Sequence, residues 1–317
     1  MRTYFKHLLA MSVLALQLAI VVPVFSQGDQ GRRDTSVVRV AVDLVLLDVS
    51  VQDKAGQPVR DLDQKYFKVY EDKLEQPITY FSSEESPVSW GLVLDRSGSM
   101  RGVMRDAYEA AINVIDQGTK EDEMFVMTFS DNVETISQFT SDRRELAYSI
   151  FSLHADGSTA LWDAVDSALD YLKQATHRKK VLVVVSDGGD NRSRVRFSQL
   201  MDRVGESDVL IYTVGMYGAM ASNPAEMRST GGARLQLEQL AEITGAYAHF
   251  PTNAQKCREV MEKIAREVSE HYTIGYYPSN QARDGRWRKL KVEVTGQPNM
   301  KYAARTRSGY YAPIAGR

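Results

Sequence analysis

The segment Trp90–Met100 has the sequence WGLVLDRSGSM, in which an apolar run leads into a loop rich in oxygen-bearing side chains. A continuous apolar run that ends in a Gly- and Ser-rich turn is typical of a central strand buried on both faces, which delivers its loop to the edge of a sheet. In this loop, Asp95, Ser97 and Ser99 alternate with spacer residues. One carboxylate and two hydroxyls aimed at one point are hard donors suited to Mg²⁺, Mn²⁺ or Ca²⁺. Taken alone, a D-x-S-x-S pentapeptide is a weak signal that fits an ordinary polar turn better than a metal site.

Two later stretches supply further oxygen donors. Residues 157–160, Gly-Ser-Thr-Ala, precede a helical pattern, and a second apolar run over residues 181–185 ends in Ser186-Asp187. This order of D-x-S-x-S, Thr and Asp resembles the von Willebrand factor A (VWA) family with its metal-ion-dependent adhesion site (MIDAS). The resemblance implies a metal site formed by Asp95, Ser97, Ser99, Thr159 and Asp187. Purely structural roles remain open, with Thr159 as the N-cap of the next helix and Asp187 as the cap of a turn.

Bulk composition is that of an ordinary globular protein, with 43% hydrophobic and 25% charged residues among 317. The formal net charge of -2 leaves no basic excess, which disfavours a nucleic acid partner. Cys257 is the only cysteine, so no internal disulfide can form. Its apolar neighbours at helical spacing, Val260, Met261 and Ile264, predict a buried thiol.

The N-terminus has the pattern of an export signal. Arg2 and Lys6 precede an apolar segment over residues 8–22, and Ser26-Gln27 is a suitable cleavage position, so we expect a signal peptide over residues 1–26. An uncleaved anchor is the alternative, but roughly 15 to 17 apolar residues, interrupted by Gln17, are short for a membrane span. No second segment of membrane length follows. We therefore expect an exported protein, periplasmic or secreted, without a transmembrane span after cleavage.

Short alternating stretches predict β structure at both ends of the remaining chain. An N-terminal β segment is expected over residues 37–82, with a change of phase near Val45–Leu47 and a loop at Glu71–Pro77. A C-terminal β segment is expected over residues 271–313, including one strand at Lys301–Tyr311. Neither segment is large enough to bury a core alone, so we expect the two to pair.

Between the flanks, strands and helices alternate over residues 87–270, which is typical of a doubly wound, mostly parallel α/β sheet with helices on both faces. The pattern predicts a helix capped by Thr159, a loop at residues 218–232 and a closing helix at Ala254–Ser269. The α/β domain would thus be inserted in a β-sandwich-like module made of both flanks. This arrangement, together with the terminal sequence RSGYY at residues 307–311, resembles VWA-related proteins abundant in acidobacteria.

The VWA resemblance implies a non-enzymatic, adhesion-type module. A cation held by neutral hydroxyls, with the carboxylates partly behind water, keeps much of its charge and attracts an outside carboxylate. In the family, that carboxylate is a Glu or Asp of a partner protein, and Mg²⁺ is the expected ion, with Mn²⁺ or Ca²⁺ as alternatives. In related domains the closing helix also shifts when the site engages a ligand, which would couple the site to the β module.

Two other functions remain open. One is a structural envelope protein whose metal only stabilises the loops. The other is a metal-dependent hydrolase. Catalysis is disfavoured because the sequence has no G-x-S-x-G, P-loop or G-x-G-x-x-G motif and its histidines lie apart.

Overall fold

A computed structural model describes residues 43–151, 153–217, 231–295 and 302–315. The expected signal peptide, the beginning of the first predicted strand and most of the predicted loop at 218–232 lie outside the described residues. Residues Val42–Arg317 form one compact unit. In the described part of the chain, no helix combines the length and the apolar character that crossing a membrane requires.

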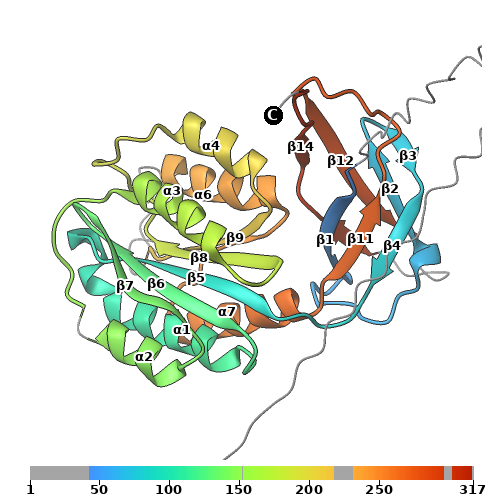
Figure 1. The fold of residues 1–317 in the computed structure, drawn as a ribbon. Helices are drawn as coiled ribbons and strands as arrows, with labels where there is room; N and C mark the ends of the chain where they lie inside the picture. The colour runs from blue at the N-terminus through green and yellow to red at the C-terminus, as the bar shows by residue number, and fades with distance from the viewer. Residues whose placement is uncertain (1–42, 152, 218–230, 296–301, 316–317) are drawn as a thin grey trace, which may run out of the picture. The chain divides into compact units, whose positions relative to one another are not determined.

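A six-stranded sheet with the order β10-β9-β8-β5-β6-β7 forms the centre of the α/β domain (Figure 1). Its strands are β5 (Val88–Asp95), β6 (Glu123–Phe129), β7 (Val133–Thr140), β8 (Lys179–Ser186), β9 (Val209–Gly215) and β10 (Ala248–His249). The pairings are parallel except for the β6–β7 hairpin. All eight residues of β5 are buried, because helices cover both of its faces, and this explains why its sequence is largely apolar, with Ser89 and Asp95 as the polar exceptions.

The helices of this domain divide between the two faces of the sheet. One face carries α1 (Met104–Gln117), α2 (Arg143–Phe151) and α7 (Ala254–Ser269), and the other carries α3 (Leu161–Tyr171), α4 (Phe197–Glu206) and α6 (Gly231–Thr244). Each group shares a separate hydrophobic core with the sheet. The predicted doubly wound α/β class is therefore confirmed. The sequence analysis did not identify α2, whose buried contacts are only Leu146 and Ile150.

Two four-stranded sheets make up the β module, with the orders β13-β1-β11-β4 and β14-β12-β2-β3. Their strands are β1 (Val45–Gln52), β2 (Phe67–Glu71), β3 (Leu74–Gln76), β4 (Ile78–Ser82), β11 (Tyr272–Tyr276), β12 (Trp287–Val294), β13 (Ala303–Arg305) and β14 (Gly309–Tyr311). In one sheet β1 pairs with β11, and in the other β2 pairs with β12. The N- and C-terminal flanks therefore build both sheets jointly, around one core that includes Leu47, Val69, Tyr272 and Val292.

Local details of the flanks differ from the sequence predictions. The stretch Glu71–Pro77, predicted as a loop, contains β3, because Asp72 and Lys73 both adopt positive φ (47° and 72°) and form a tight hairpin turn. From Val45 onward, β1 pairs with β11 without a register shift, so the expected irregularity near Val45–Leu47 does not fall within this pairing.

The predicted single strand Lys301–Tyr311 is in fact two strands, β13 and β14, which belong to different sheets. Between them Ser308 N donates to Ile243 O at the end of α6 at 3.0 Å, while Ser308 O accepts from Leu290 N of β12 at 2.9 Å. The contact with α6 interrupts the extended ladder and lets the chain cross from one sheet to the other.

Candidate metal site

Three loops meet at the carboxyl edge of the parallel sheet. The first loop follows β5 and contains a 3₁₀ turn at Gly98–Gly102, the second precedes α3, and the third follows β8. Because β5 and β8 are parallel neighbours, with Leu94 opposite Val185, their terminal carboxylates Asp95 and Asp187 leave the sheet at adjacent positions. The five residues predicted for the metal site are all carried by these three loops.

Backbone hydrogen bonds tie the three loops together. Gly98 N donates to Gly157 O at 3.0 Å, which joins the first loop to the second. Asn191 N donates to Thr159 O at 3.0 Å, and Thr159 N donates to Asn191 Oδ1 at 2.9 Å, which joins the second loop to the third. Gly157 has φ +82°, and a Cβ there would lie 2.5 Å from Asp131 Oδ2, so the second loop requires glycine at this position. The loops therefore form one bonded framework.

Asp95 lies at the base of this framework and is only 1% exposed. Its Oδ1 accepts from Ser97 N at 2.8 Å and its Oδ2 accepts from Ser186 Oγ at 2.6 Å. Burial raises the pKa of Asp95 to about 6, against the effect of these hydrogen bonds, and the nearby charge of Asp187 acts in the same direction as burial. A buried carboxylate beside a second carboxylate is a setting in which a cation would relieve electrostatic strain.

The hydroxyl-bearing residues are carried by the first two of these loops. Ser97 Oγ and Ser99 Oγ are 3.1 Å apart, close to the separation of about 3.0 Å that adjacent ligands have around an octahedral Mg²⁺ with oxygens at ~2.1 Å. Ser97 and Thr159 are buried, whereas Ser99 is exposed and Asp187 is partly exposed. The donor set is thus buried on one side and open to solvent on the other, and its chemistry fits a hard divalent cation.

The structure corrects the expected capping role of Thr159. The N-cap residue of helix α3 is Ala160, and its side chain makes no capping hydrogen bond. Instead, Asp190 Oδ1 accepts from Leu161 N at 3.0 Å and from Trp162 N at 3.5 Å. Thr159 itself bonds through its backbone N–H, which donates to Asn191 Oδ1 at 2.9 Å.

Two residues of this edge were missed by the sequence analysis, namely Ser186 and Asp190. Ser186 was identifiable from its place next to Asp187 at the end of β8, since the parallel register puts it opposite Asp95. The sequence gives no comparable signal for Asp190, because this residue accepts a hydrogen bond from Leu161 N, at the start of a helix 29 residues earlier in the chain.

Residues 91–189 match the family model described as the von Willebrand factor type A domain. The chain contains a von Willebrand factor type A domain. The matched range of this type A domain includes all five positions predicted to form the metal site. No curated protein matches the chain significantly.

Several solved structures are similar to the type A domain and its surroundings. A von Willebrand factor type A protein from Catenulispora acidiphila is 12% identical, with 86% of this chain and 74% of that chain covered and a TM-score of 0.47. The vWF domain of the type V pili tip protein Mfa5 from Porphyromonas gingivalis is 12% identical, with coverages of 58% and 97% and a TM-score of 0.45. Proximal thread matrix protein 1 from the mussel byssus, with a zinc-occupied MIDAS motif, is 17% identical, with coverages of 62% and 49% and a TM-score of 0.48.

Clusters of carboxylate, imidazole and thiolate side chains are a common form of metal site. Across residues 43–151, 153–217, 231–295 and 302–315, no group of three or more His, Cys, Asp or Glu side chains could hold an ion. Cys257 is buried against Met216, with 3.6 Å between the two sulfur atoms, and burial raises its thiol pKa to about 12, in agreement with the predicted inert thiol.

Proposed function

We propose that the type A domain is a metal-dependent, protein-binding module that captures a carboxylate of a partner protein. The ligands would be Asp95, Ser97, Ser99, Thr159 and Asp187, and Mg²⁺ is the ion that best suits these oxygens. The observation that supports the proposal is that all five residues lie on three loops at one edge of the sheet and that these loops are hydrogen-bonded to one another. When bound, the cation would supply a positive charge to which a partner's Glu or Asp can attach.

The residues of the chain have distinct tasks in this proposal. Ser97 and Thr159, which are buried, would fix the inner side of the coordination shell, and Ser99 would stand at its exposed rim. Asp95 would orient the Ser97 loop through the bond from Ser97 N while its other oxygen stays on Ser186. Hydroxyl ligands are neutral, so the charge of the ion would be only partly cancelled before the partner binds.

We further propose that the protein is exported and that it is not an enzyme. The first proposal rests on the signal-like pattern of residues 1–26, and the second on the sequence, in which the motif contains no general base and the histidines lie apart. The boundaries of the β segments, 37–82 and 271–313, and of the type A domain, 87–270, are proposals of the same kind.

A peptide experiment tests the proposed function. Peptides that contain a single Glu or Asp, and matched peptides that contain Gln or Asn, are presented to the protein in Mg²⁺ and in EDTA. The proposal predicts binding that requires both the carboxylate and the metal and that disappears in the Thr159→Ala variant. Binding that persists in EDTA, or that does not distinguish Glu from Gln, would contradict it.

The same samples separate the proposal from a purely structural metal. A metal whose free concentration is 100 times its Kd raises the free energy of unfolding by about 2.7 kcal/mol, whether the metal binds a partner or only stabilises the loops. A structural role predicts this stabilisation with no selective binding of any acidic peptide. A hydrolase would instead consume a peptide or ester added to the metal-loaded protein.

A further inference from the structure

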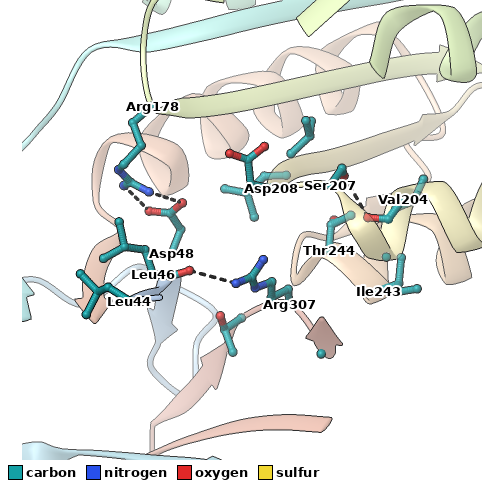
Figure 2. A pocket seen from close by; sticks show the side chains of 15 residues that line it. Leu44, Leu46, Asp48, Arg178, Val204, Ser207, Asp208, Ile243, Thr244 and Arg307 are labelled. Atoms are coloured by element: carbon teal, nitrogen blue, oxygen red, sulfur yellow. Dashed lines mark hydrogen bonds and ion pairs between the residues drawn. The ribbon is translucent and has the colours of Figure 1, made fainter. Parts of the chain in front are cut away.

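A second candidate binding site lies at the opposite edge of the parallel sheet from the metal site. A cavity of about 210 Å³ opens between β1 and the amino-terminal ends of β8 and β9 (Figure 2). Arg178, directly before β8, and Val209 and Leu210, the first residues of β9, line it together with Asp48 of β1 and Arg307. This volume is below the ~300–1,000 Å³ of sites for drug-sized ligands, so only a small molecule would fit.

The acidic groups of this cavity already have cationic partners. Arg178 donates to both carboxylate oxygens of Asp48, with Nη2–Oδ1 at 2.7 Å and Nη1–Oδ2 at 3.3 Å. Asp208 pairs with Lys180 at 3.4 Å and is largely exposed. These two ion pairs leave no anion in the lining that is free to serve a third cation.

Arg307 is that third cation. Its Nη2 donates to Leu46 O at 3.3 Å, while its Nε is buried and has no hydrogen-bond partner among the described residues. The neighbouring Thr306 Oγ1, which belongs to the same lining, is also buried and unpartnered within that part of the chain. Burial lowers the pKa of Arg307, although the nearby carboxylates of Asp208 and Asp48, which are paired with other cations, act in the opposite direction. Unsatisfied buried donors of this kind are rare in native proteins and call for a partner.

The rest of the lining is apolar. Leu44 and Leu46 face the cavity from the β module, and Val204 and Ile243 face it from α4 and α6 (Figure 2). Leu44 is 39% exposed, so the apolar part of the cavity opens to solvent beside it. A ligand that fits both halves has one anionic group and a short hydrocarbon portion.

We propose that this cavity binds a small amphipathic monocarboxylate, with its carboxylate on Arg307 and Thr306 and its hydrocarbon portion against Leu44, Leu46 and Ile243. A carboxylate matches the flat donor array of a guanidinium. A dianion such as phosphate fits less well, because Arg307 is the one unpaired cation in the described lining and Asp48 and Asp208 are nearby. The site also gives a role to the terminal RSGYY sequence, whose arginine is Arg307.

The test is a titration of the full chain with butanoate, hexanoate, octanoate, hexanamide and inorganic phosphate. All titrations are run in EDTA, so that a carboxylate cannot bind through a metal at the other edge, and a failure of this proposal is distinct from a failure of the proposed function. We expect saturable binding of the acids, tightening about fourfold per added methylene while the cavity accommodates it. Hexanamide should bind at least about tenfold more weakly than hexanoate, since it lacks the charge.

The variant Arg307→Gln should weaken hexanoate binding at least about tenfold. Arg305→Gln is the matched control and should bind like the unaltered protein, because Arg305 stacks on Tyr247 and donates to Ala246 O outside the cavity lining. In the unaltered protein the NMR signal of the Arg307 Nε–H should shift on addition of hexanoate, a readout that does not depend on the variant folding. Absence of binding by any acid, equal binding of hexanamide, or tighter binding of phosphate than of hexanoate would overturn the proposal.

Discussion

Replacing Glu267 by Gln should change the pH dependence of stability. Glu267 lies on α7, is 1% exposed, and connects three elements of the fold. Tyr212 Oη donates to its Oε1 at 3.1 Å, and Gln52 Nε2 donates to its Oε2 at 3.3 Å. Burial raises the pKa of Glu267 to about 7, although the hydrogen bond from Tyr212 and the charges of Lys263 and Arg305 act in the opposite direction.

The sign of the effect follows from linkage. The unfolded chain releases the Glu267 proton near the ordinary pKa of 4.5, whereas the folded chain keeps it to about pH 7. The folded state therefore holds more protons between these values, and stability falls as the pH rises through this window. With these two pKa values, the loss between pH 5 and pH 8 is about 2.5 kcal/mol for this one group. Gln at this position has nearly the same size, carries no charge and should not contribute that loss.

Urea unfolding of the unaltered protein and of Glu267→Gln at pH 5 and pH 8, in EDTA and at constant ionic strength, measures the effect. Taking the difference between the two proteins at each pH cancels all other titrating groups. We predict that the difference in the free energy of unfolding shifts by about 2.5 kcal/mol in favour of Glu267→Gln from pH 5 to pH 8. If the difference does not change with pH, the pKa of the Glu267 carboxyl is not raised by burial, and the prediction is refuted.

Further predictions concern packing, capping and thiol reactivity. Gly91→Ala should lower the free energy of unfolding, measured in urea, by at least ~1–3 kcal/mol, because the new Cβ would lie 2.5 Å from Phe125 Cζ in the core. Gly231→Ala is the control and should not destabilise the protein, because no atom lies within 4 Å of its new Cβ. Asp190→Ala should cost ~1 kcal/mol by removing the acceptor at the start of α3, and Asp190→Asn should restore most of it. Cys257 should react with a thiol reagent only on the timescale of unfolding, so rapid reaction in native buffer would contradict its burial.

The sequence predicts the α/β domain well because its strands and helices have clear local patterns. The apolar runs that become β5 and β8 could only be central strands, and the spacing of residues 254–269 predicts α7 over the same residues that the structure assigns to it. Helix α2 was missed because it buries only Leu146 and Ile150, which is too little for a recognisable periodicity.

Long-range bonds account for two of the errors. The break between β13 and β14 depends on the contact of Ser308 with Ile243, which lies 65 residues away in sequence. The capping of α3 by Asp190 likewise depends on how two loops meet in space. In contrast, Asp95 and Asp187 each follow an apolar run directly, and Thr159 lies between them in the chain, so all three can be recognised in the sequence. A family resemblance could therefore identify the candidate site before its geometry was known.

The central claim is that the edge of the sheet at Asp95 binds a divalent cation. Calorimetric titration of Mg²⁺ and Mn²⁺ into chelator-treated protein tests it most directly, with Asp95→Ala as the test variant and Asp116→Asn, an exposed position on α1, as the matched control. We predict saturable binding of one ion per chain to the unaltered protein and to Asp116→Asn, and no binding to a folded Asp95→Ala variant. Failure of both ions to bind the unaltered protein, or equal binding to Asp95→Ala, would contradict the claim.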